Sequence, residues 1–146
     1  REPLVDTVEA KAVVATADCS FFDLDLNTVT IEELAFKRDF AIQMGRTDTV
    51  HALLVYFTCS FTSRNNPTAK LVEFSTGPAD KYTHWKQSVF YLPKDLPVTA
   101  GDFIRGTFSC APNARNRRDL DFEIVYEQVR SDGTVVAADS MKYHMA

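Results

Sequence analysis

Apolar and polar residues alternate one by one along most of this chain, and the spacing of an amphipathic helix is nearly absent. Successive side chains of a strand point to opposite faces, so each alternating stretch predicts a strand with one buried and one solvated face. We expect one long strand from His51 to Thr62. The apolar sets of the four clearest stretches are Phe22, Leu24 and Leu26; Phe36, Phe40, Ile42 and Met44; Leu53, Val55, Phe57, Cys59 and Phe61; and Leu120, Phe122, Ile124 and Tyr126.

The length and the aromatic content favour one all-β domain with a single core. The 146 residues include eleven Phe and five Tyr against five Gly, which suits a core filled by aromatic rings. We predict a single β-barrel or sandwich-like domain over residues 1–146, with about seven to nine antiparallel strands. One short helical turn is expected at residues 29–35. Thr30 would cap its N-terminus, and Glu33, three positions later, would complete a capping box.

Composition excludes several classes of partner. The net charge of −4 argues against a nucleic-acid binder and favours a basic partner. No apolar run approaches the roughly 20 residues of a membrane span.

The three cysteines lack a paired spacing, which predicts free thiols in a reducing compartment, and the three histidines show no metal-ligand spacing. The first residue is Arg1 rather than Met, so we expect a fragment of a longer protein or a processed product.

The connection at residues 63–85 is long for a compact domain, and no strand longer than Leu71–Phe74 is expected in it. Its end reads KYTHWKQSVFYLP, residues 81–93. His84 titrates in the neutral range and could act as a base or pair with a carboxylate, and Trp85 offers a flat apolar wall. The alternative is a tryptophan that plugs the end of a barrel beside a solvated histidine. Spacing alone favours this alternative.

Two charged segments have a functional and a structural interpretation. The basic run at residues 113–118 could bind an anion, but we prefer a solvated hairpin loop with Asp119 and Asp121 as local partners. Five acids could form a surface for an arginine-rich ligand, although acids that alternate along strands usually mark a solvated face. These acids are Asp18, Asp23, Asp25, Glu32 and Glu33. Glycine-rich phosphate loops are absent from the sequence.

Four stretches in a fixed order resemble the protein arginine N-methyltransferases, in particular the C-terminal half of the type I enzymes. They are REPLVDTVE at 1–9, FSTGPADKYTHWKQSVFYLP at 74–93, GDFIRGTFSCAPNARNRRDLDFEI at 101–124 and YHM at 143–145. The resemblance covers essentially the whole chain. It implies a substrate-binding β-barrel domain, with the cofactor-binding domain and most of the dimerisation arm lying outside this sequence.

The resemblance also implies roles for three residues. His84, as a catalytic residue, would pair with an acid of the absent cofactor-binding domain, and Thr83 and Trp85 would contribute to binding the substrate arginine. No residue here would bind cofactor or metal, and S-adenosylmethionine would be held by the rest of the enzyme. The isolated segment is then expected to be inactive. The triplet form implies asymmetric dimethylation.

The implied partners are Arg-Gly-rich proteins and histones as substrates, the enzyme's own cofactor-binding domain, and a second copy in a homodimer. No membrane and no direct nucleic-acid partner are expected, and the implied location is the nucleus and cytoplasm. Two alternatives remain open: a non-catalytic interaction barrel acting as scaffold or regulator, and an unrelated ligand-binding β-sandwich.

Overall fold

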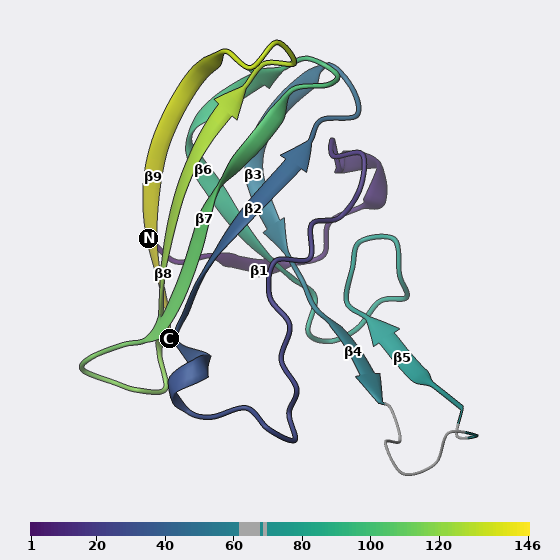
Figure 1. Ribbon diagram of the computed structural model, residues 1–146, viewed down its shortest axis with the longest axis vertical. Coiled ribbons are helices and arrows are strands. Elements are labelled where there is room, and N and C mark those ends of the chain that lie inside the picture. The colour runs from purple at the N-terminus through teal and green to yellow at the C-terminus, as the bar shows by residue number, and fades with distance from the viewer. Residues whose placement is uncertain (62–67, 69) are drawn as a thin grey trace.

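A computed structural model describes residues 1–61, 68 and 70–146 of the chain (Figure 1). This part contains nine strands and two 3-10 turns, all strand pairs being antiparallel. The all-β prediction is confirmed. The elements are β1 Leu4–Asp6, η1 Ala10–Ala12, η2 Glu32–Leu34, β2 Phe36–Gln43, β3 Asp48–Val55, β4 Thr58–Phe61, β5 Val72–Ser75, β6 Gln87–Val98, β7 Phe103–Pro112, β8 Leu120–Val129 and β9 Val135–Met145.

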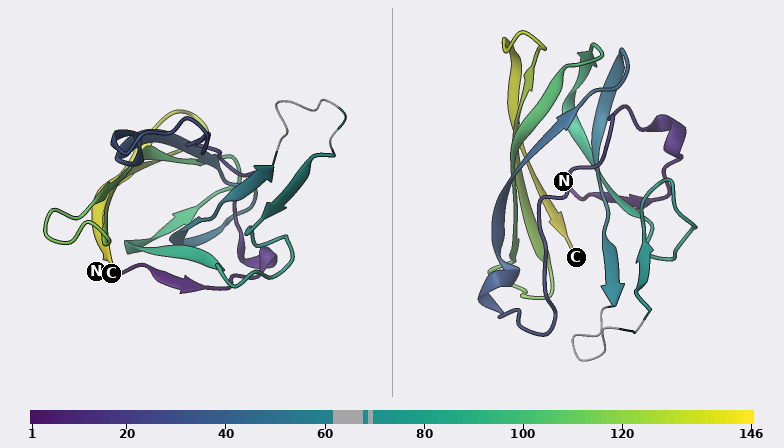
Figure 2. Two further views of the ribbon diagram at one scale, coloured as in Figure 1. Left: turned by 90° about the horizontal axis from the view of Figure 1, so that it is seen from below. Right: turned by 45° about the vertical axis from the view of Figure 1, so that its right-hand side comes forward.

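Two sheets form the body of the domain. One has the strand order β1-β6-β3 and the other β2-β7-β8-β9, while β4 and β5 pair as a separate ribbon. The two larger sheets curve around a shared interior, and the ribbon extends away from them (Figure 2). The ends of the chain lie side by side, since the His144 N–H donates to the Arg1 carbonyl at 2.8 Å.

The core is where the inward faces of the two larger sheets meet. Phe90 of β6 is almost fully buried and makes edge-on ring contacts with Phe108 at 5.5 Å and Tyr143 at 5.2 Å between centroids. Ile104 and Ile124 are completely buried beside them. Each large apolar side chain buried in this way contributes about 2 kcal/mol to folding. The predicted inward sets of β2 and β8 are confirmed.

The prediction of a strand near Phe22, Leu24 and Leu26 is wrong. Residues 21–25 form no strand, and both leucines are exposed. Phe22 stacks instead on Phe36 with 3.9 Å between ring centroids. Asp25 turns the chain. Its side chain accepts a hydrogen bond from the Asn27 N–H, and its backbone carbonyl accepts from the N–H groups of Thr28 and Val29. A strand needs hydrogen bonds to a neighbouring strand. Here the Asx turn satisfies the backbone groups locally instead.

The expected strand from His51 to Thr62 is interrupted. It divides into β3 and β4 because Thr76 forms hydrogen bonds with both backbone groups of Phe57. The Thr76 N–H donates to the Phe57 carbonyl, and the Thr76 hydroxyl accepts from the Phe57 N–H. Thr62 lies outside the described residues.

The helical turn expected at 29–35 is present as η2, and the Glu33 carboxylate accepts from the Thr30 N–H at 2.8 Å. Thr30 itself makes no side-chain cap, because Ile31 stands at the N-cap position. A further turn, η1, was not predicted.

Candidate functional site

The turn at residues 83–86 lies immediately before β6 at one end of the three-stranded sheet. The Lys86 N–H donates to the Thr83 carbonyl at 3.1 Å and closes the turn. Lys86 has a φ of 56°, in the left-handed region that residues other than glycine seldom adopt. His84 and Trp85 therefore stand at the tip of a sharp chain reversal, and both are exposed.

The three predicted site residues share this turn. The His84 and Trp85 rings are 3.9 Å apart between centroids and tilted by 34°. Thr83 is half-buried, and its hydroxyl oxygen has no hydrogen-bond partner among the described residues.

Trp85 belongs to a group of four rings that we call the aromatic cluster: Phe57, Phe61, Phe74 and Trp85. Trp85 lies 5.6 Å from Phe74 in a stacked arrangement and 5.8 Å from Phe57 edge-on. Phe61 stacks on Phe74 with 6.5 Å between ring centroids. Trp85 remains 49% exposed and Phe61 59% exposed. Grouped exposed aromatic rings mark a surface that contacts a partner or ligand.

The register of the β4–β5 ribbon explains why these rings are exposed. Phe57 and Phe61 continue the inward alternation of β3, but the ribbon leaves the body of the domain at Thr58. Their side chains consequently meet Phe74 of β5 instead of an opposing sheet. Their alternation with polar residues predicts an inward position for both rings, so neither was predicted as a site residue. The available signal was an aromatic alternation that runs on into the long 63–85 connection.

Within the described residues, His84 forms no ion pair, unlike the other two histidines. His51 lies 2.9 Å from Asp95, and His144 lies 2.8 Å from Asp121. The nearest charged contact of the turn is on Lys86, whose ammonium group is 3.6 Å from Asp6.

The loop at residues 113–118 is exposed and folded by its asparagines. Asn113 binds the Asp121 carboxylate, Asn116 binds that of Asp119, and both carboxylates also contact His144. Asp119 and Asp121 are thus local partners of the loop, as predicted, and they bind it through its asparagines. None of the guanidinium groups of Arg115, Arg117 and Arg118 forms an ion pair with a described residue.

The five acids considered as a surface are all exposed, and some serve local structure. Hydrogen bonding from the Thr30 backbone lowers the pKa of Glu33. Burial raises the pKa of the Tyr56 hydroxyl well above its ordinary value, and hydrogen bonding to Asp18 adds to this.

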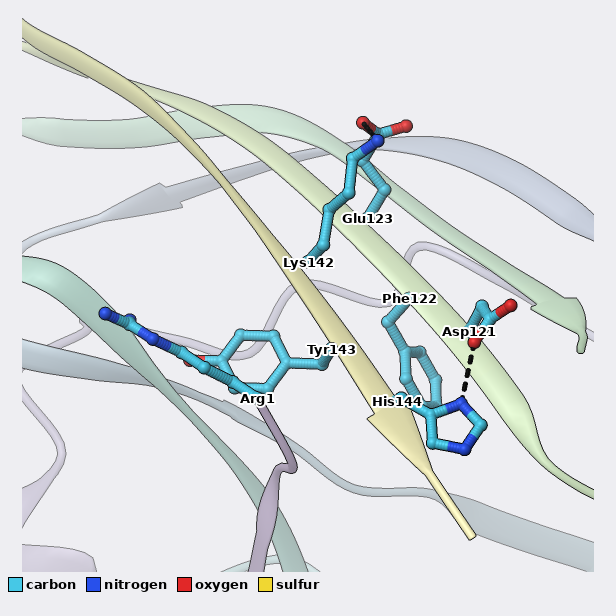
Figure 3. Close-up of a pocket in the computed structure, with 7 residues that line it drawn as sticks. All are labelled: Arg1, Asp121, Phe122, Glu123, Lys142, Tyr143 and His144. Atoms are coloured by element: carbon cyan, nitrogen blue, oxygen red, sulfur yellow. Dashed lines mark hydrogen bonds and ion pairs between the residues drawn. The ribbon is translucent and has the colours of Figure 1, made fainter.

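A shallow groove of about 410 Å³ lies away from the turn, over β8, β9 and the start of the chain (Figure 3). Its charged side chains are paired in part, Lys142 with Glu123 at 3.2 Å and His144 with Asp121. The groove is lined by Arg1, Asp121, Phe122, Glu123, Lys142, Tyr143 and His144. Among these, none was predicted as a site residue.

The cysteines are free thiols, and burial raises the pKa of Cys110 to about 11. In residues 1–61, 68 and 70–146, no group of three or more His, Cys, Asp or Glu side chains could hold a metal ion. The same residues include no helix long and apolar enough to cross a membrane.

A family model described as the arginine methyltransferase oligomerization subdomain matches residues 1–131. The chain belongs to the arginine methyltransferase family. An unrelated ligand-binding β-sandwich is therefore wrong, and the resemblance seen in the sequence is confirmed.

Similar proteins carry the same family name. Protein arginine N-methyltransferase 1 of Schizosaccharomyces pombe is 45% identical over 146 residues, covering 99% of this chain and 42% of that protein. The Dictyostelium discoideum protein of the same name is 41% identical, covering 99% of this chain and 40% of its own length. The chain thus spans less than half the length of these relatives.

Solved arginine methyltransferases share the fold. The Trypanosoma brucei PRMT1 enzyme-prozyme heterotetrameric complex with AdoHcy aligns with a TM-score of 0.88 and 32% identity, over 99% of this chain and 44% of that one. Arabidopsis thaliana protein arginine methyltransferase 10 aligns with a TM-score of 0.91 at 17% identity, over 99% of this chain and 42% of that one. This second match supports the fold alone.

Proposed function

We propose that this chain is the substrate-side and assembly domain of a type I protein arginine N-methyltransferase, and that the turn at residues 83–86 forms one wall of its arginine site. The observation that carries the proposal is the aromatic cluster, which leaves Trp85 exposed beside His84. Membership of the arginine methyltransferase family supplies the reaction class.

The chemistry explains why such a wall is useful. A guanidinium group must lose water and lie flat, with one nitrogen aimed at the methyl group that it accepts. The partly exposed indole of Trp85 offers a flat aromatic wall that attracts a planar cation, and ring contacts with Phe74 and His84 hold it in place. The cofactor, S-adenosylmethionine, supplies the electrophilic methyl group when bound. No residue of this chain is proposed to bind it, since the sequence contains no glycine-rich phosphate loop.

His84 is proposed to pair with an acid of the cofactor-binding domain. His84 is exposed and forms no ion pair among the described residues, which agrees with a partner acid that lies outside this chain. Such a pair would hold two domains in register across the site, and Thr83 would contribute to binding the substrate from the same turn.

The wider assignments follow from the family. We propose asymmetric dimethylation of Arg-Gly-rich proteins and histones, a homodimeric enzyme, and a location in the nucleus and cytoplasm. Oligomerization is the property named by the family model itself.

The test uses the complete methyltransferase that carries this segment and an Arg-Gly-rich peptide. Trp85→Ala should lower kcat/KM for the peptide on the order of 100-fold, because misplacing a bound reactant by about 1 Å costs a factor of this size. His84→Ala should lower it as well. His51→Ala is the matched control, since His51 is exposed but pairs with Asp95 away from the turn.

Normal methylation by both turn variants would overturn the assigned roles. The remaining alternative, a non-catalytic scaffold barrel, predicts no methylation even by the unaltered protein. It also predicts that the upstream coding sequence lacks an intact cofactor loop.

A further inference from the structure

Gln87 is a buried polar residue directly after the turn. It is the first residue of β6 and is 7% exposed. Its side-chain N–H donates to the Thr76 carbonyl at 2.6 Å, and its side-chain oxygen accepts from the Val8 N–H at 2.8 Å. Both ends of the amide are therefore used, each by a different segment of the chain.

The chain of hydrogen bonds continues through Thr76 to the aromatic cluster. Thr76 is almost fully buried, and its N–H donates to the Phe57 carbonyl at 2.9 Å. The Phe57 ring in turn contacts Trp85. Hydrogen bonds thus join Val8, Gln87, Thr76 and Phe57 in succession, and Gln87 directly follows the turn that carries Trp85.

The turn needs an external support of this kind. Lys86, between Trp85 and Gln87, has its backbone in the left-handed region. Such a conformation persists where the surrounding structure determines it. Gln87 is also paired in register with Asp6 of β1, and the Asp6 carboxylate reaches the Lys86 ammonium group. Gln87, the residue after the strained Lys86, is therefore held by its side chain and also by pairing with β1.

We propose that Gln87 is the positioning residue of the turn at 83–86: its side-chain amide fixes Trp85 and His84 relative to Phe57. An effect of Gln87 on catalysis rests on the proposed function, whereas its effect on the position of Trp85 is independent of that function.

The first test reads the position of Trp85 directly. Trp85 is the sole tryptophan of the 146-residue sequence, so the emission of the chain reports on the turn. Gln87→Leu should shift the emission maximum and increase acrylamide quenching. Gln87→Asn is the second variant if the leucine form does not fold, because it keeps a side-chain amide but is one methylene shorter and cannot bind the Thr76 carbonyl and the Val8 N–H at once.

Gln128→Leu is the matched control. Gln128 is 3% exposed and donates to the Pro97 carbonyl at 2.8 Å, near the other end of β6 and roughly 30 Å away at about 3.3 Å per residue. Both substitutions remove a buried amide that binds a backbone carbonyl, so both should lower the melting temperature. Only the change at Gln87 should alter Trp85 emission.

The second test uses the complete methyltransferase. Gln87→Leu should raise KM for an Arg-Gly-rich peptide on the order of tenfold relative to Gln128→Leu, with KM for S-adenosylmethionine unchanged. General loss of folded enzyme would lower apparent kcat and leave both KM values as they were.

Equal Trp85 emission in folded Gln87 and Gln128 variants would overturn the positioning role. A shifted emission with no effect of either Gln87→Leu or Trp85→Ala on methylation would support the positioning role and overturn the proposed function.

Discussion

His144 lies between two carboxylates near the end of β9. Its Nδ1 atom is 2.8 Å from Asp121 and its Nε2 atom is 3.4 Å from Asp119. The hydrogen bond to Asp121 is the largest cause that raises the pKa of His144, and the same bond lowers the pKa of Asp121. Because β8 and β9 are held together here, the charge state of one side chain bears on their pairing.

The pH dependence follows from these directions. The contribution of His144 is fully present below its ordinary pKa of 6.5 and is lost as pH rises through its higher folded-state pKa. The contribution of Asp121 is present above 3.8 and is lost as pH falls through its lower folded-state pKa. The pair is therefore strongest between these limits.

We expect His144→Gln to lower the melting temperature more at about pH 5.5 than at about pH 9. Thermal unfolding at the two pH values measures the difference. Asp121→Asn is the control background, in which the pH dependence of the substitution should shrink. An equal difference in melting temperature between His144→Gln and the unaltered chain at both pH values would contradict the role assigned to this ion pair.

At the scale of elements, β7 and β8 approach each other closely at Gly106. A Cβ atom added there would lie 1.9 Å from the Val125 carbonyl oxygen and 2.8 Å from the Tyr126 Cα. Both obstacles are backbone atoms of the neighbouring strand, so no side chain can move aside to make room. The absence of a side chain at this position permits the pairing that holds the centre of the four-stranded sheet.

Gly106→Ala should therefore destabilise the domain by about 3 kcal/mol, because overpacking against backbone forces strands apart. Chemical denaturation measures the change. Gly45→Ala is the control, since its added atom would meet Thr16 Cγ2 at 3.2 Å and Val14 O at 3.3 Å, contacts that a small shift relieves. Equal stability of the two variants would show that the sheet can open at Gly106 at little cost.

At the scale of the whole molecule, the aromatic cluster is the largest group of exposed rings with mutual contacts in the described residues. The free edges of the sheets add unpaired backbone groups. Exposed apolar surface of this kind favours association when no partner covers it.

We expect the 146-residue chain to self-associate at high concentration, and Phe61→Ser to reduce the association measured by light scattering. Val136→Ser is the matched control, because Val136 is 45% exposed on β9, outside the aromatic cluster. A monomer at every concentration, or equal effects of the two substitutions, would contradict the role of the cluster.

Much of this architecture could be predicted from alternation alone. Phe40 and Met44 in and near β2, and Ile124 and Tyr126 in β8, are buried as their spacing indicates. These positions are predictable because a strand between two neighbours has one fixed inward face. Leu24 and Leu26 are exposed despite their alternation, because no strand of the described residues pairs with their segment and Asp25 turns the chain.

The all-β class, the resemblance to arginine methyltransferases and the adjacency of Thr83, His84 and Trp85 could all be recognised in the sequence. Folding in three dimensions brings Phe57 and Phe74 against Trp85 and Phe61 against Phe74, and it lets Gln87 connect Thr76 with Val8. The two sets of features differ in the sequence range of the interactions that create them. Alternation is a local property of one strand, whereas the Thr76–Phe57 and Gln87–Val8 hydrogen bonds join residues 19 and 79 positions apart.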